Sequence, residues 1–396
     1  MVIKKLIAIS VVFALVAGAA FAVDLAGDVI VGVKVVDSKA KGAYNDTNAA
    51  TLAATPPTNA GKYGDGEAKL FNGGNLGRTR LEGSGEADIG IGTIGGWLRF
   101  DLAGSVYGKA WWQPIEQLRI QLSHNPDGEF DTSHIGRYGF YAQANELGLV
   151  NSDGNWGGVS FDTGVFGGDG GAHDFALIIT PMDGLTINVA FPWNVGGKAA
   201  DTFKQTLFQA NYNADFGAVH ITYKGVNDGR VVGKFWGSVY LGSLVDGLGL
   251  ELGVGFVAHE SAASYKDPLS IALGAKYDVN EQFGVKLRTI FAIESGGGDD
   301  KIHMRVDLLP YYAINENVTA YFDAGVYLPS KSNMIWHINP YVRIGAEWGA
   351  GFYVGLAVNN AGKEGRGTTI ANYYEADVKS SDGINFSIPI GLIAKF

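Results

Sequence analysis

Many segments of this chain carry an apolar side chain at every second position. From Val318 to Leu328 one parity is entirely apolar, while the other includes Thr319, Asp323 and Gly325. A β-strand points successive side chains to opposite faces, so each such segment predicts a strand with one apolar and one more polar face. A fold built from these strands must place the two faces of its sheet in different environments.

The alternation recurs in segments of about ten residues that are separated by polar loops. The composition agrees, because the chain has 58 glycines, which weaken helices, and 18 Tyr and 21 Phe, which favour strands. Our count is 18 strands, with 16 as the alternative if the tight hairpin near Asp101 to Ser105 does not form. We expect these strands near 24–37, 78–90, 95–101, 105–113, 117–124, 173–180, 185–193, 203–214, 218–226, 230–243, 248–259, 268–279, 283–294, 301–314, 318–328, 335–348, 351–360 and 383–396.

The N-terminus has the features of an export signal. Lys4 and Lys5 precede an apolar run from Leu6 to Val16, and residues 20–22 form a small-x-small cleavage site. The alternative is an uncleaved anchor, but the run is shorter than the roughly 20 residues of a spanning helix. We therefore expect residues 1–22 to be a cleaved signal peptide and residues 23–396 to form one exported domain.

The strand series predicts an all-β fold, a transmembrane antiparallel β-barrel whose apolar parity contacts lipid. A soluble β-sandwich rarely has so many strands in one domain, and a β-propeller needs a repeat of about 40 residues, which this sequence lacks. With no cysteines, the exported chain cannot use disulfides, and the closed hydrogen-bonded ring of a barrel supplies stability instead.

Loop lengths are uneven, which predicts the orientation of the barrel. Long connections occur at about 38–76, 125–172 and 361–382, whereas other connections are short clusters of Asn, Asp and Gly. Such barrels have short periplasmic turns and longer outer loops. This assignment leaves both termini in the periplasm, as an even number of strands requires.

The last residues add a resemblance to a known family. Phe386, Ile388, Ile390, Leu392, Ala394 and Phe396 share one parity, and all six are apolar. A chain that ends in such a strand on an aromatic residue resembles the outer-membrane β-barrel porins of diderm bacteria. The resemblance implies an outer-membrane location, contact with outer-membrane lipid, insertion machinery that reads the Phe386–Phe396 strand, and a homotrimer. The stretch around Trp111 and Trp112 is also similar to hairpins of spirochaete porin-like proteins.

The inward parity holds most of the charge within the strands. A barrel of 16 or more strands is too wide for side chains to fill, so these residues are expected to line water and to set ion preference. The alternative is that they only solvate the wall or pair across strands. The pore-lining candidates are Arg78, Arg80, Arg99, Arg119, Lys286, Arg288, Arg305, Arg343, Glu82 and Glu86.

The connection at about 125–172 is the candidate constriction, because loops of this length tend to be functional or disordered. In classical porins a long third loop folds into the lumen and sets acidic residues against a basic wall. This sequence is similar in charge layout, although the loop follows the fifth predicted strand; the segment could equally cover the outer mouth. Its acidic candidates are Asp127, Glu129, Asp131, Glu146 and Asp153.

Other motifs are weak. The Gly90-x-Gly92-x-x-Gly95 spacing lacks a following helix, so we interpret it as a turn rather than a dinucleotide site. No HExxH or GxSxG occurs, and the formal charge of −10 argues against nucleic acid as a partner. We expect no enzyme activity, cofactor or metal. The sequence predicts a porin for passive diffusion of small hydrophilic solutes; the alternative is a surface adhesin that uses the barrel as an anchor.

Overall fold

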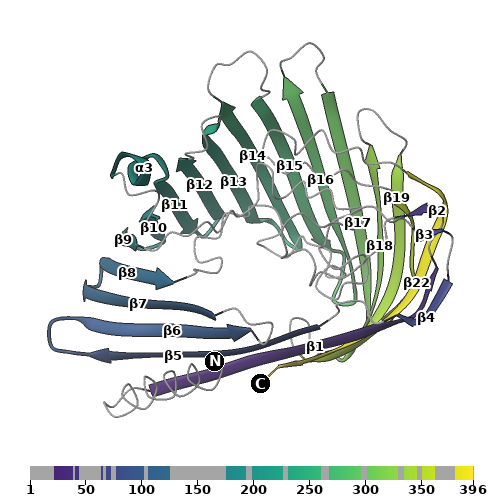
Figure 1. Ribbon diagram of the computed structural model, residues 1–396, viewed down its shortest axis with the longest axis horizontal. Helices are drawn as coiled ribbons and strands as arrows, with labels where there is room; N and C mark the ends of the chain where they lie inside the picture. Colours follow the sequence, from purple (N-terminus) through teal and green to yellow (C-terminus); the bar gives the residue numbers. More distant parts are fainter. Residues whose placement is uncertain are drawn as a thin grey trace.

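The computed structural model describes residues 22–38, 41–43, 64–65, 68–72, 77–101, 106–124, 175–192, 199–225, 231–259, 267–295, 301–328, 334–345, 350–361 and 380–395. In this part of the chain, twenty strands form one sheet and two short strands, β2 and β3, pair separately. Figure 1 shows the sheet curving around so that its first and last strands lie side by side.

The strands follow one another along the chain with little helix between them. The first half contains β1 (Ala22–Ser38), β2 (Lys41–Ala43), β3 (Gly64–Asp65), β4 (Ala68–Asn72), β5 (Gly77–Asp88), β6 (Thr93–Asp101), β7 (Val106–Ile115), β8 (Leu118–His124), β9 (Phe175–Met182), β10 (Leu185–Phe191), helix α3 (Ala199–Lys204), β11 (Leu207–Ala214) and β12 (Gly217–Gly225). The second half contains β13 (Val231–Val245), β14 (Leu248–His259), β15 (Asp267–Asp278), β16 (Phe283–Ser295), β17 (Lys301–Asn315), β18 (Val318–Leu328), β19 (Ile335–Gly345), β20 (Gly351–Gly355), β21 (Ala357–Ala361) and β22 (Ser380–Lys395).

The antiparallel pairings close into a ring. β1 pairs with β5 on one side and with β22 on the other, where Val31 is the partner of Leu392. From β5 to β19 each strand pairs with the next one in sequence. β20 and β21 then connect β19 to β22. The described chain is therefore an all-β antiparallel barrel, as predicted, and closure satisfies the backbone groups that an open sheet edge would expose.

Two positions in the ring are each occupied by two shorter strands. β4 and β5 both pair with β1, and β20 and β21 both lie between β19 and β22. The break between β20 and β21 lies opposite Pro340 of β19. Pro340 accepts a hydrogen bond from the backbone N–H of Leu356 at 2.9 Å but has no N–H to return one. The number of membrane-spanning strands, 18 or 16, stays a prediction.

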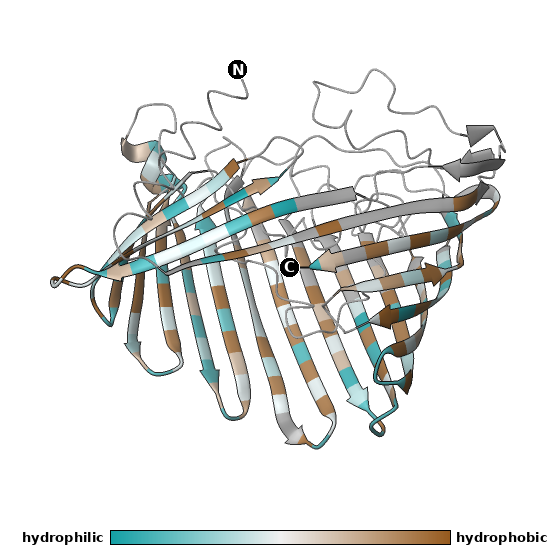
Figure 2. Ribbon diagram, turned by 90° about the horizontal axis from the view of Figure 1, so that it is seen from below, coloured by the Kyte–Doolittle hydropathy of each residue, from teal (hydrophilic) through white to brown (hydrophobic). Residues whose placement is uncertain are grey.

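Side chains on the barrel wall have an inverted distribution for a protein in water. On β14, Glu251 is 0% exposed whereas its neighbour Leu252 is 50% exposed; on β18, Asp323 is 2% exposed and Phe322 45%. Figure 2 shows the corresponding alternation of polar and apolar bands along the strands. Interiors of water-soluble proteins favour apolar side chains, so this arrangement fits a barrel with lipid outside and polar groups inside.

Short turns join alternate strands. In an antiparallel ring every second connection lies at the same edge, and these turns lie along the lower edge of the barrel in Figure 2. Gly184 and Gly247 adopt φ angles of 77° and 73°, which favour glycine. Asn280 accepts hydrogen bonds from the backbone N–H groups of Gln282 and Phe283 at 2.9 and 2.8 Å, as Asn does in turns.

Besides the division of the expected strand at 351–360 into β20 and β21, the structure departs from the predicted elements in two places. The expected strand at 203–214 starts only at Leu207, because the preceding residues belong to α3. Three short strands lie within the expected loop at 38–76, and one of them, β4, pairs with β1. Within the described ranges, no helix is long and apolar enough to cross a membrane.

Candidate functional site in the inner wall

The inner face of the barrel is lined by polar side chains that the strand alternation turns away from the apolar outer face. Their burial means that they contact one another and the surrounding chain closely. The buried charged members are Arg99, Lys224, Glu251, Lys286, Arg288, Asp307, Asp323 and Arg343.

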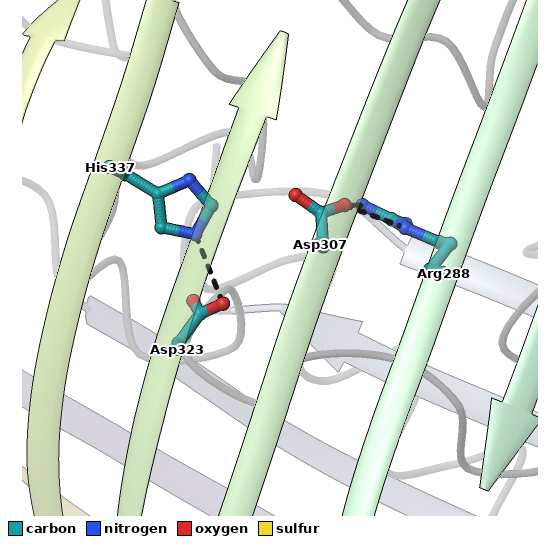
Figure 3. A network of polar contacts seen from close by, with 4 residues as sticks. All are labelled: Arg288, Asp307, Asp323 and His337. Atoms are coloured by element: carbon teal, nitrogen blue, oxygen red, sulfur yellow. Dashed lines mark hydrogen bonds and ion pairs between the residues drawn. The ribbon is translucent and has the colours of Figure 1, made fainter.

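An ion pair and a histidine–carboxylate contact lie side by side on β16 to β19 (Figure 3). Nε and Nη2 of Arg288 both donate to Oδ2 of Asp307, at 3.0 and 2.7 Å. On the next two strands, Nε2 of His337 lies 3.0 Å from Oδ1 of Asp323. Arg288 and Asp307 thus provide each other with the hydrogen-bonded partner of opposite charge that a buried charge requires.

Gly325 makes room for this cluster. Asp307, Gly325 and His337 are register partners across β17, β18 and β19. A Cβ atom at Gly325 would lie 2.4 Å from Cε1 of His337 and 2.5 Å from Oδ1 of Asp307. The absence of a side chain at this position lets the side chains of both neighbours extend over β18.

A second row of side chains is aromatic. Tyr311, Tyr321 and Tyr341 are register partners, and the rings of Tyr321 and Tyr341 stack with centroids 4.7 Å apart and an interplanar angle of 8°. Cations lie near both ends of this region, with Lys286 Nζ 5.7 Å from the Tyr311 ring and Arg343 Cζ 5.3 Å from the Tyr353 ring. Tyr321 and Tyr341 are buried, so this row stiffens the wall rather than offering a face to a ligand.

The wall formed by β5 to β8 combines cations with aromatic rings. Nε of Arg80 and Nε of Arg99 lie 3.2 and 3.3 Å from Oδ1 of Asp101. Glu82 accepts a hydrogen bond from the indole N–H of Trp97 at 3.3 Å. The cations on this wall therefore contact both carboxylates and ring faces.

The inner face of β10 to β12 contains a network of neutral polar groups. Asn188 donates to Gln209 at 2.7 Å, and Gln209 donates to the hydroxyl of Thr222 at 3.3 Å. His220 lies between Thr222 and Asn211 and contacts both. These amide, hydroxyl and imidazole groups satisfy most of one another's hydrogen bonds, as buried polar groups generally do, although Oδ1 of Asn188 has no hydrogen-bond partner among the described residues.

The predicted pore-lining residues fall into two groups on the ring. Arg80, Glu82, Arg99 and Arg119 lie on the β5–β8 wall, and Glu86 is exposed near the turn that follows β5. The second group, on β16 and β19, consists of Lys286, Arg288 and Arg343, which are 4%, 2% and 1% exposed. Arg78 and Arg305 belong to β5 and β17, but their side chains lie outside the described part, as do Asp127, Glu129, Asp131, Glu146 and Asp153.

Sequence reasoning did not single out His337 or Gly325. The alternation around Asn339, Tyr341 and Arg343 places His337 on the inner face, but only the register brings it next to Asp323 and Gly325. Among the described residues, no group of three or more His, Cys, Asp or Glu side chains could hold a metal ion.

Comparison with known proteins identifies the fold. No protein-family model matches the chain, and no curated protein sequence matches it. The structure is similar to the anion-selective porin from Comamonas acidovorans, with a TM-score of 0.52 and 13% identity over 95% of this chain and 100% of the porin. It is also similar to OmpT, an outer membrane protein of Vibrio cholerae, with a TM-score of 0.51 and 11% identity over 95% of this chain and 98% of that protein. The chain thus has the transmembrane β-barrel fold of bacterial outer-membrane porins.

Proposed function

We propose that this protein is an outer-membrane porin through which small hydrophilic solutes diffuse passively. The observation that carries this proposal is the inverted wall, with carboxylates and guanidinium groups inside the ring and Leu, Phe and Ile side chains exposed outside it. A sheet of this kind is stable only where hydrocarbon surrounds it, and a polar interior provides a path for solutes. No covalent chemistry is part of this function.

We infer that the segment at about 125–172 narrows the path. It connects β8 to β9, and several inward-facing residues on β8 to β12 are fully buried. Gln121, Ala176, Ala190, Leu207 and Thr222 are all 0% exposed, although they belong to a wall that would otherwise face water. Chain packed against this wall would explain their burial and would bring Asp127, Glu129, Asp131, Glu146 and Asp153 into the lumen.

The expected orientation is consistent with the register of the terminal strands. Ala22 at the start of β1 is the partner of Glu86, close to the turn between β5 and β6. Ile393 near the end of β22 is the partner of Gly351, the first residue of β20 after the short connection from β19, so both ends lie near the edge with short turns. In our proposal this edge is periplasmic and the signal peptide has been removed. Recognition of the Phe386–Phe396 strand by insertion machinery, a homotrimer and a spirochaete lineage are further parts of the proposal that rest on family resemblance.

Conductance in planar lipid bilayers tests the proposal. The full chain, folded in detergent and added to a bilayer, is expected to give stepwise, long-lived increases in current. A correctly folded barrel that inserts without conducting would contradict the porin function and would favour the adhesin, whose function needs only the anchor and the outer loops.

A further inference from the structure

The inner wall of β6 to β8 carries an alternating set of cations and aromatic rings. In one pair, Arg99 of β6 is the register partner of Tyr107 of β7. In the next pair the order is reversed, since the ring belongs to Trp97 of β6 and the cation to Lys109 of β7. The third pair is Gly95 with Trp111, and Arg119 of β8 supplies the cation there. We call Trp97, Arg99, Tyr107, Lys109, Trp111 and Arg119 the cation–aromatic patch.

Each cation of the patch lies over a ring. The guanidinium carbon of Arg99 is 4.1 Å from the centroid of Tyr107, and that of Arg119 is 4.0 Å from the centroid of Trp111. Nζ of Lys109 is 5.2 Å from the centroid of Trp97. All three distances lie within the range of about 6 Å in which a ring attracts a cation. Polar neighbours also hold two of the cations, because Nε of Arg99 lies 3.3 Å from Oδ1 of Asp101 and Nη2 of Arg119 donates to Oε1 of Gln121 at 2.6 Å.

A glycine in the wall beneath the patch makes room for one of the large aromatic rings. A Cβ atom at Gly95 would lie 2.2 Å from the ring of Trp111, so the lack of a side chain at Gly95 makes room for this ring beside β6. Trp97, Tyr107, Lys109, Trp111 and Arg119 are partly exposed, in contrast to the buried Tyr321 and Tyr341 on the opposite side of the ring. The patch therefore offers ring faces and cations to a solute at the same place.

The charge balance at the patch itself favours anions. The inner face of β6 to β8 carries three basic side chains, Arg99, Lys109 and Arg119, and one acidic side chain, Asp101, whereas on the neighbouring β5 Arg80 is accompanied by Glu82, Glu86 and Asp88. Successive pairs along a strand are about 7 Å apart, since two residues span that length. A solute with one carboxylate and one planar ring can thus contact a cation and a ring from adjacent pairs.

We propose that the cation–aromatic patch is a binding site for small planar aromatic anions, such as aromatic carboxylates, within the lumen. This inference rests on the proposed channel function, because the solute must reach the inner wall. The carboxylate is held by the guanidinium and ammonium groups, and the ring stacks on Trp97 or Trp111. The site would enrich such solutes in the lumen over saturated anions of the same charge.

Equilibrium binding to the full chain in detergent micelles tests this site without requiring a channel. Benzoate and cyclohexanecarboxylate are compared by ligand-observed NMR, because they share a charge and differ in planarity. We expect benzoate to bind at least about tenfold more tightly, as ring stacking and cation–π contacts allow. Equal affinities would overturn the proposal.

Matched variants locate the site. Trp97→Leu and Trp111→Leu should each weaken benzoate binding by about tenfold and leave cyclohexanecarboxylate binding within about twofold, whereas Arg119→Gln should weaken both. Tyr240→Leu and Lys276→Gln, which alter inward-facing residues on β13 and β15, are the controls. Benzoate binding that is unchanged in both tryptophan variants, with folding verified by gel mobility, would overturn the proposal. Trp97→Phe retains a ring and keeps the test valid if Trp97→Leu does not fold.

Conductance in bilayers separates this inference from the porin function. Stepwise block of the current by benzoate, relieved in Trp111→Leu, supports both. If the channels open but benzoate and cyclohexanecarboxylate bind equally well and block the current equally, the porin function is supported and the binding site is rejected. If the protein binds benzoate selectively but never conducts, the binding site is supported and the porin function is rejected.

Discussion

Arg288 on β16 and Asp307 on β17 form a buried, two-point ion pair, with both guanidinium contacts made to the same carboxylate oxygen. Their side chains are 2% and 7% exposed, so water screens the pair little. Removing one partner leaves a buried charge without its counterion, which is the costly change, whereas replacing both is often tolerated.

Asp307→Leu should therefore lower the free energy of unfolding by about 3–5 kcal/mol, and the double variant Arg288→Met, Asp307→Leu should recover most of the loss. Urea unfolding in phospholipid vesicles, followed by tryptophan fluorescence, measures both. The control is the ion pair of Lys276 and Asp278, whose side chains are 36% and 39% exposed. This pair should contribute less than about 1 kcal/mol to the free energy of unfolding. Equal losses at the two pairs would contradict this account of the buried pair.

A side chain at Gly325 should disturb the cluster in Figure 3. Gly325→Val places Cβ where Asp307 Oδ1 and His337 Cε1 lie, and a backbone oxygen of Val306 is only 2.9 Å away. We expect a loss of about 1–3 kcal/mol, typical of overpacking. Gly96→Ala is the control, because its nearest neighbour would be 3.5 Å from Cβ. Unfolding in urea compares them, and a Gly325→Val barrel as stable as the control would show that the cluster can shift freely.

A charge on the outer face should impair insertion into lipid. Leu308 lies in the middle of β17 and is 43% exposed. Leu308→Arg should disfavour folding into vesicles by about 2–4 kcal/mol, the cost of Arg near the bilayer midplane. Glu316→Arg, in the turn between β17 and β18, should have little effect. If gel-shift assays show that both variants insert equally well, the outer face does not contact hydrocarbon.

Deletion of residues 130–165 tests the proposed constriction. If this segment lies in the lumen, its removal should increase the single-channel conductance, because the path becomes wider. The measurement uses the same bilayer and salt for both proteins. A conductance that does not change would mean that the segment does not narrow the path.

The strands themselves could be predicted because alternation is a local property. The apolar parity of residues 301–314 and 318–328 corresponds to β17 and β18, whose ends agree within one residue. Helix α3 was missed because its six residues, Ala199–Lys204, are fewer than the window over which a helical period can be recognised. The break at Leu356 depends on Pro340 of the neighbouring strand, which the local pattern does not contain.

The site was harder to predict, because period two gives the face of a side chain but not its neighbour across the sheet. The sequence predicted Arg288 for the inner parity, whereas its partner Asp307 follows only from the register of β16 and β17. In the same way, the stacking of Arg119 on Trp111 depends on the offset between β7 and β8. Residue-level roles in the pore therefore need the three-dimensional pairing.

The pairing of β1 with β22 also constrains how the molecule is made. The two strands that close the ring are more than 300 residues apart in the sequence, so β1 is synthesised long before the strand with which it must pair. A chain that ends before β22 would have two exposed edge strands, whose unpaired N–H and C=O groups can pair with other chains. Because contacts of such large sequence separation form slowly, safe assembly requires that the unfinished polypeptide be shielded in transit.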